Sequence, residues 1–110
     1  MQTSTETKAA LRNLKIKAGT LRRNMKDYDS YKKEKAALEL KVENLKAAEG
    51  TEAGIISRAE SEVAETSTVL ILTWTRIETA LDELKTLMSQ YDGADEVTQV
   101  EDWTAAIALV

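Results

Sequence analysis

The sequence predicts an all-α protein, an elongated three-helix bundle made of a long antiparallel, coiled-coil-like helical hairpin and a shorter third helix. The 110 residues include no proline and only four glycines, so little interrupts long helices. Apolar residues recur in alternating steps of three and four, which is the heptad pattern of packed helices. A chain of this length holds one domain, and we expect a single helical domain over residues 1–110.

The first helix is expected at about residues 4–49. Thr3 and Glu6 have the spacing of a capping box, which places its start. The seam repeats a step of three between Tyr28 and Tyr31, and this predicts a stammer, a locally overwound stretch of helix. The predicted seam consists of Leu11, Leu14, Ala18, Leu21, Met25, Tyr28, Tyr31, Lys35, Leu38, Val42 and Leu45.

The second helix is expected at about residues 55–91, after a turn that Gly50 and Gly54 bracket. Residues 66–75 are rich in β-branched side chains and resemble a strand locally. We assign them to the helix because both flanks have helical periodicity. Two consecutive steps of four, at Thr66, Leu70 and Trp74, should face the stammer. The predicted seam consists of Ile56, Ala59, Val63, Thr66, Leu70, Trp74, Ile77, Leu81, Leu84, Met88 and Tyr91.

A third helix is expected at about residues 95–109, with Asp92 or Asp95 as its cap. Its apolar face would consist of Val97, Val100, Trp103, Ile107 and Val110. The four successive apolar residues 69–72 of the second helix point in nearly all directions around its axis. Burying them needs more than one neighbour, which favours a third helix.

Composition argues against catalysis. The chain has no cysteine and no histidine, so it lacks thiolate ligands, the usual zinc ligands and the commonest general base. We therefore expect no catalytic residues, no cofactor and no metal site. No apolar run approaches the roughly 18 residues of a membrane span, and the N-terminus has no signal-peptide character. These features predict a cytoplasmic protein that is not an enzyme and does not bind membranes.

Charge divides the chain into two halves. Residues 1–50 hold 12 Lys and Arg against 7 Asp and Glu, a net charge of +5, whereas residues 51–110 hold 3 against 12, a net charge of −9. Either the basic helix pairs with the acidic helices of its own bundle, or its outer face meets an acidic partner. Interleaved carboxylates and the low pI speak against nucleic acid.

One stripe on the outer side of the first helix combines basic residues with Ile16 and Gly19. A glycine within a helix costs roughly 1 kcal/mol relative to alanine, and an outward isoleucine gains nothing from its own seam. Either the third helix packs on this stripe, or the stripe is an interaction surface where Gly19 permits close approach. The stripe consists of Arg12, Ile16, Gly19, Arg23 and Lys26, flanked by Lys15, Arg22 and Lys17.

A motif without gaps runs along this helix and consists of Lys15-Ile16-Lys17-Ala18-Gly19, Arg22-Arg23, Lys26-Asp27 and Tyr31-Lys32-Lys33-Glu34. This motif resembles the first helix of the tubulin-folding cofactor A family. Weaker similarity extends to residues 76–84 and 101–106. Ala18 replaces the family's usual threonine, and Leu70-Ile71-Leu72 stands where the family has Ile-Pro-Asp, so its proline kink is not expected here.

The resemblance implies a cytosolic chaperone that captures β-tubulin released from the cytosolic chaperonin, on the route to the α/β-tubulin heterodimer. It implies a monomer that is associated with the tubulin pool and at most weakly self-associating. The alternative is a generic coiled-coil subunit of a cytoskeletal or scaffold complex. Carried over from the motif, the candidate β-tubulin-binding residues are Lys15, Lys17, Gly19, Arg22, Arg23, Lys26, Tyr31, Lys32 and Glu34.

Overall fold

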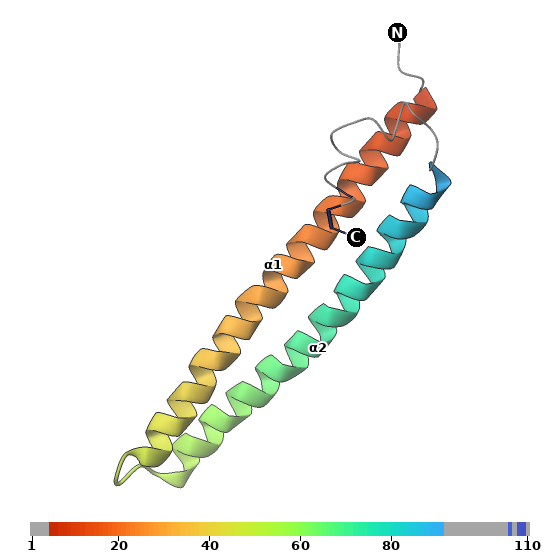
Figure 1. Ribbon diagram of the computed structural model, residues 1–110. Helices are drawn as coiled ribbons and strands as arrows, with labels where there is room; N and C mark the ends of the chain where they lie inside the picture. Colours follow the sequence, from red (N-terminus) through yellow and green to blue (C-terminus); the bar gives the residue numbers. More distant parts are fainter. Residues whose placement is uncertain (1–4, 92–105, 107, 110) are drawn as a thin grey trace. The chain divides into compact units, whose positions relative to one another are not determined.

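The computed structural model describes residues 5–91, 106, 108 and 109 and contains two long helices, α1 at Thr5–Ala47 and α2 at Ala53–Gln90 (Figure 1). The all-α prediction and the antiparallel pairing of two long helices are confirmed. The chain divides into two compact units, residues 1–25 with 76–110 and residues 26–75. Each helix contributes a segment to both units. No helix among the described residues is long and apolar enough to cross a membrane.

The expected third helix, at about 95–109, falls mostly on residues outside the described part of the chain. Of this stretch the structure describes Ala106, Ala108 and Leu109. Ala106 is fully buried in the first unit, and the Leu109 amide donates a hydrogen bond to the Ala106 carbonyl at 3.0 Å. Thr3, the expected cap of the first helix, also lies outside the described residues. Both the third helix and this cap stay predictions.

The turn of residues 48–52 closes the second unit as a helical hairpin (Figure 1). Gly50 has a positive φ of 79°, which only glycine adopts without steric cost after the end of a helix. The Thr51 hydroxyl donates to the carbonyl of Ala48 at 3.2 Å and so satisfies one of the last carbonyls of α1. Gly54 lies inside the first turn of α2 and not in the connection, so the turn lies two residues earlier in the chain than the sequence indicates.

The seam of α1 follows one uninterrupted heptad repeat, and the predicted stammer at Tyr28 is wrong. In the first half of the helix the repeat runs through Ala10, Lys17 and Asn24, and Met25 is exposed. Leu11 and Ala18 are also covered, which widens the seam without shifting it. The buried or half-buried heptad positions are Thr7, Ala10, Leu14, Lys17, Leu21, Asn24, Tyr28, Tyr31, Lys35, Leu38, Val42 and Leu45.

The seam of α2 is equally regular, and the predicted double step of four is wrong as well. Thr73 occupies the seam at 2% exposure, whereas Trp74 is 49% exposed and lies beside it. Ala80 likewise replaces Leu81 as the deeper residue. The buried or half-buried heptad positions are Ile56, Ala59, Val63, Thr66, Leu70, Thr73, Ile77, Ala80, Leu84, Leu87 and Tyr91.

Threonines fit this seam because their hydroxyls bond to the helix itself. Thr66 donates to the Glu62 carbonyl at 3.0 Å, and Thr73 donates to the Val69 carbonyl at 2.8 Å. A buried hydroxyl with a partner avoids the free-energy penalty of an unpaired polar group. Residues 66–75 are helical, as predicted against their local strand character.

Candidate functional site

The nine candidate residues all lie on α1, but they belong to two different units. We therefore describe the two groups separately. The first unit holds Lys15, Lys17, Gly19, Arg22 and Arg23, and the second holds Lys26, Tyr31, Lys32 and Glu34.

In the first unit, α1 presents an outer face of free cations. Residues 5–25 carry six Lys and Arg against one Glu, a net charge of +5. This segment therefore holds the whole positive excess of the first half of the chain. Five of its basic residues are exposed and form no ion pair within the described residues; besides Lys8 near the start of α1, the other four are Arg12, Lys15, Arg22 and Arg23. We call these four residues the basic face.

Ile16 and Gly19 lie on the same side of the helix as the basic face. Ile16 is exposed, as the sequence predicts for its outward position. A Cβ built on Gly19 would meet no described atom within 4 Å, so no neighbour in the described part of the chain requires a glycine there. The glycine thus costs helix stability without serving the packing of the described residues.

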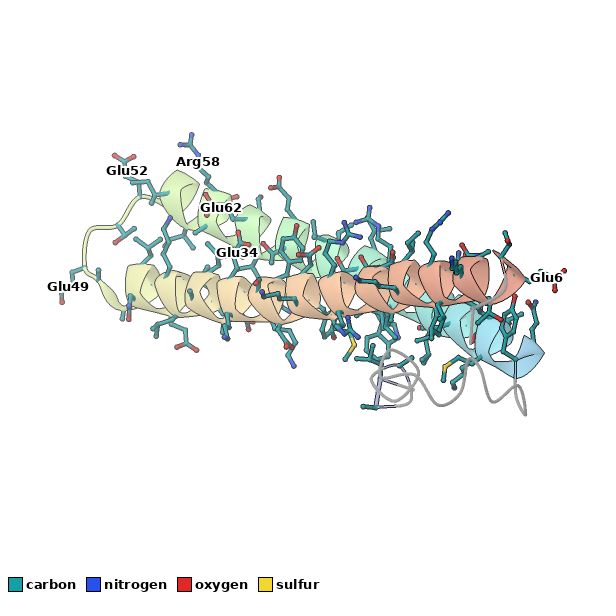
Figure 2. The ribbon with its side chains drawn as sticks, turned by 90° about the horizontal axis from the view of Figure 1, so that it is seen from above. Glu6, Glu34, Glu49, Glu52, Arg58 and Glu62 are labelled. Carbon is teal, nitrogen blue, oxygen red and sulfur yellow. The ribbon has the colours of Figure 1, made fainter. Side chains whose placement is uncertain are left out.

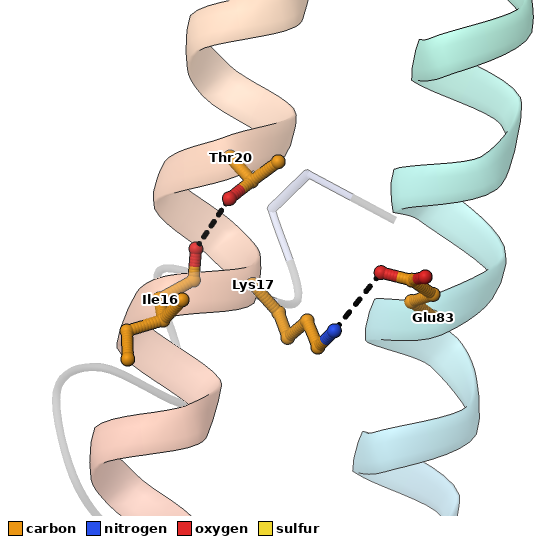
Figure 3. A network of polar contacts seen from close by, with 4 residues as sticks. All are labelled: Ile16, Lys17, Thr20 and Glu83. Atoms are coloured by element: carbon orange, nitrogen blue, oxygen red, sulfur yellow. Dashed lines mark hydrogen bonds and ion pairs between the residues drawn. The ribbon is translucent and has the colours of Figure 1, made fainter.

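Lys17 lies at a seam position and not on the outer face. Its Nζ is 3.0 Å from Oε2 of Glu83 on α2, so the ammonium forms an ion pair across the two helices of the first unit (Figure 3). Both side chains are about half exposed. Nearby, the Thr20 hydroxyl donates to the Ile16 carbonyl at 3.0 Å. The contact gives Lys17 a structural partner that the other cations of this group lack.

In the second unit the candidate residues again divide between seam and surface. Tyr31 is half-buried at a seam position, while Lys26 and Glu34 are exposed. The Lys32 ammonium lies 5.5 Å from the centroid of the Tyr28 ring, within the range of a cation–π interaction. Tyr31 therefore packs between the helices, and Lys32 is held over an aromatic side chain.

Two ion pairs join the helices of the second unit near its turn. Lys46 and Glu60 lie 3.6 Å apart, and Lys41 and Glu62 lie 3.8 Å apart, each joining α1 to α2. Glu49 and Glu52 point outward at the turn (Figure 2). The basic half of the chain therefore does pair with acidic residues of its own fold, as one of the two interpretations of the charge division predicts. These pairs involve other lysines than those of the basic face.

Sequence reasoning missed an apolar groove in the second unit. It is lined by Tyr28, Lys35, Ser67, Leu70, Ile71 and Trp74. Trp74 was expected in the seam, but Thr73 takes that position and leaves the indole about half exposed on the groove. The signal that could have found it is the unbroken heptad through Thr66, Leu70 and Thr73, which places Trp74 one position outside the seam.

This arrangement offers surfaces for recognition. In the described part of the chain no three His, Cys, Asp or Glu side chains are grouped so that they could hold a metal ion. The features that remain are a paired helical scaffold, a face of unpaired cations and an exposed apolar groove. Together they define a helical binding protein whose contacts are made by helix surfaces.

Comparison with known proteins identifies the kind of binding protein. The family model for tubulin binding cofactor A matches residues 9–110. The chain is 30% identical over 104 residues to the tubulin-folding cofactor A of Arabidopsis thaliana, covering 93% of this chain and 91% of that protein. No solved structure matches.

The chain therefore belongs to the tubulin binding cofactor A family, as its first-helix motif predicts. Members of this family are chaperones of tubulin folding that bind β-tubulin and are not enzymes. The chemistry of this protein is accordingly recognition of a protein client.

Proposed function

We propose that this chain captures β-tubulin after its release from the cytosolic chaperonin and stabilises it on the way to the α/β-tubulin heterodimer. The chaperone acts as a monomer in the cytosol and uses the basic face of α1 as its first contact. Gly19 and Lys26 border the contact, whereas Lys17 and Tyr31 support it from the seam. No nucleotide or metal takes part, because the client is bound and not chemically altered.

The observation that carries the proposal is the unpaired charge of the basic face. Arg22 and Arg23 are exposed and adjacent, on a segment with a net charge of +5, and they have no carboxylate partner among the described residues. Cations left free in this way produce a field that steers an acidic client towards the surface. Such contacts raise the association rate and select the partner more than they raise affinity.

The experiment is charge reversal on this face. In the variant Arg22→Glu with Arg23→Glu, the association rate constant with β-tubulin should fall by at least about tenfold at low salt. The difference from the unmodified chain should vanish as salt screens the charges. The helix content, measured by circular dichroism, should stay unchanged because both side chains are exposed.

A matched control reverses two exposed cations of the same unit on the other helix, Arg76→Glu with Lys85→Glu. This control changes the net charge equally and should keep most of the association rate. Equal losses in both variants would reduce the effect to net charge, and no loss in either would remove the basic face from the binding surface.

The alternative function is that of a coiled-coil subunit that pairs with another helical protein through its seam. Sedimentation of the free chain distinguishes the chaperone function from the coiled-coil function. A chaperone of the proposed kind sediments as a monomer at all concentrations and shifts only with β-tubulin. A coiled-coil subunit would dimerise as its concentration rises and would ignore β-tubulin.

A further inference from the structure

The groove of the second unit has a lining unlike that of a solvated helix surface. Ile71 is 68% exposed and lines the groove with the half-exposed indole of Trp74, whereas Leu72, 53% exposed, is not part of the lining. Single exposed apolar residues are common on proteins, but a contiguous group of them marks a binding surface. Residues 66–75 also contain no charged side chain, between Glu65 and Arg76. This surface of α2 is therefore apolar over nearly three helical turns.

The threonines of this segment make it less polar than its composition suggests. The Thr68 hydroxyl donates to the Ala64 carbonyl and the Thr75 hydroxyl donates to the Ile71 carbonyl, each at 3.2 Å. Both residues are exposed, yet their hydroxyls already have partners within the helix. Their methyl groups extend the apolar surface that Ile71 and Leu72 begin.

The α1 side of the groove supplies aromatic and cationic groups. The Tyr28 ring lies beside Trp74, and Lys35 contributes to the lining. Lys32 is held over the Tyr28 ring. Neither lysine forms an ion pair with any described residue. The groove therefore has an apolar wall on α2 and an uncompensated positive rim on α1.

The described C-terminal residues do not supply this lining. Ala106, Ala108 and Leu109 belong to the first unit, whereas every lining residue of the groove belongs to the second. The described lining comes from α1 and α2, and the volume of the groove is about 420 Å³. This volume is within the range of sites that hold a ligand of several side-chain-sized groups.

We propose that this groove is a second contact for the client, and that it binds a β-tubulin segment in which an apolar side chain stands beside carboxylates. The apolar side chain packs on Ile71 and Trp74, and the carboxylates face Lys32 and Lys35. Charge complementarity favours this occupant over a second copy of the chain, because a copy would bring its own Lys32 and Lys35 to a rim that is already positive, and like charges repel. The inference rests on the proposed function and adds a site to it.

The first test removes the apolar wall without disturbing the helix. Glutamine is a good helix former, so Ile71→Gln should preserve helix content. The dissociation constant for β-tubulin should rise by about tenfold, since a few buried anchor residues carry most of the energy of an interface. The control is Leu40→Gln, at an exposed apolar residue of the same unit outside the groove, with an exposure of 56%. It should bind like the unmodified chain.

The second test places a reporter in the groove. Because the chain has no cysteine, Ile71→Cys offers a single site in the lining for an environment-sensitive dye. Adding β-tubulin should shift the emission of the dye to shorter wavelength, while the same dye at Leu40→Cys should not respond.

The third test compares Lys35→Gln with Lys33→Gln, an exposed neighbour outside the lining. Only the former should lower the salt dependence of binding.

The outcomes separate this inference from the proposed function. If the unmodified chain binds β-tubulin but the groove variant binds equally well and the dye at residue 71 is silent, the groove is not a client site and the proposed function stands. If the unmodified chain does not bind β-tubulin at all, the proposed function fails and the groove proposal fails with it. A dye response that depends on the concentration of the chain alone would assign the groove to self-association and overturn the proposed occupant.

Discussion

Trp74 of α2 lies against Tyr28 of α1, with ring centroids 5.5 Å apart and ring planes inclined at 53°. Tilted pairs at this distance are favoured because the positive edge of one ring meets the negative face of the other. Both rings also line the apolar groove. The pair thus joins the two helices of the second unit while it forms part of the candidate client site.

A double-mutant cycle measures this pair. Tyr28→Leu, Trp74→Leu and the combined variant should give a coupling free energy of about 0.5–1.5 kcal/mol in urea unfolding followed by circular dichroism. Tyr28→Leu combined with Leu40→Ala serves as the control, because twelve residues of helix separate these positions by about 18 Å. That control should be additive, and coupling of the same size in both cycles would show that the aromatic contact contributes nothing specific.

The sequence was sufficient to predict the two long helices, but not which side chains of each helix lie at the seam between them. Helix type followed from the absence of proline and from the steps of three and four, which remain visible however the helices pack. The predicted seam positions were chosen by hydrophobicity. This criterion selected Met25 over Asn24 and Trp74 over Thr73. The heptad instead places the small or polar residue at the seam and leaves the larger one at its edge. The hydroxyl of Thr73 has its partner in its own helix, so hydrophobicity alone could not rank it as core.

The candidate site was only partly accessible to sequence reasoning for the same reason. The motif of α1 collects residues by their order in the chain, so it includes Lys17 and Tyr31, which the fold places at the seam. It also excludes the groove, because the groove needs residues from two helices that are about forty positions apart in sequence, such as Tyr28 and Ile71. Such pairs follow from the register between helices, which the motif does not contain.

Thr73→Val tests the interpretation of the buried threonine. Valine has the same shape, and the Val69 carbonyl keeps its helical partner, the amide of residue 73, when the hydroxyl is lost. Back-bonding hydroxyls slightly destabilise helices, so the free energy of unfolding should stay equal or rise by up to about 1 kcal/mol. Thr75→Val is the control, since it removes the same kind of bond at an exposed position and should change stability by less than about 0.5 kcal/mol. A loss above about 1 kcal/mol for Thr73→Val would mean that the hydroxyl itself stabilises the seam.

The ion pair of Lys17 with Glu83 should contribute little to stability despite its 3.0 Å length. Both side chains are about half exposed, and exposed pairs typically contribute about 0.2–1 kcal/mol. A double-mutant cycle with Lys17→Met and Glu83→Gln should give a coupling in this range at low salt. It should fall towards zero in about 1 M sodium chloride, where the screening length is about 3 Å. A coupling that survives high salt would instead place the pair in a drier environment than the described residues provide.

Gly19 and Gly50 should respond in opposite directions to the same substitution. Gly19 lies within α1 with no described atom near its missing Cβ, so Gly19→Ala should stabilise the chain by about 1 kcal/mol. Gly50 has a φ of 79°, and Gly50→Ala should destabilise the chain by about 1–2 kcal/mol because alanine is strained in that conformation. Urea unfolding measures the change in the free energy of unfolding for both variants. Each variant serves as the control for the other, because the two changes should have opposite signs.

The binding experiment on Gly19→Ala then decides what the glycine is for. If β-tubulin approaches the backbone of α1 closely at this point, the added methyl group overpacks the contact. The dissociation constant should then rise by about tenfold, although the free chaperone has become more stable. A gain in stability without any change in binding would show that the client does not approach α1 at Gly19, and would restrict the contact on this helix to its charged side chains.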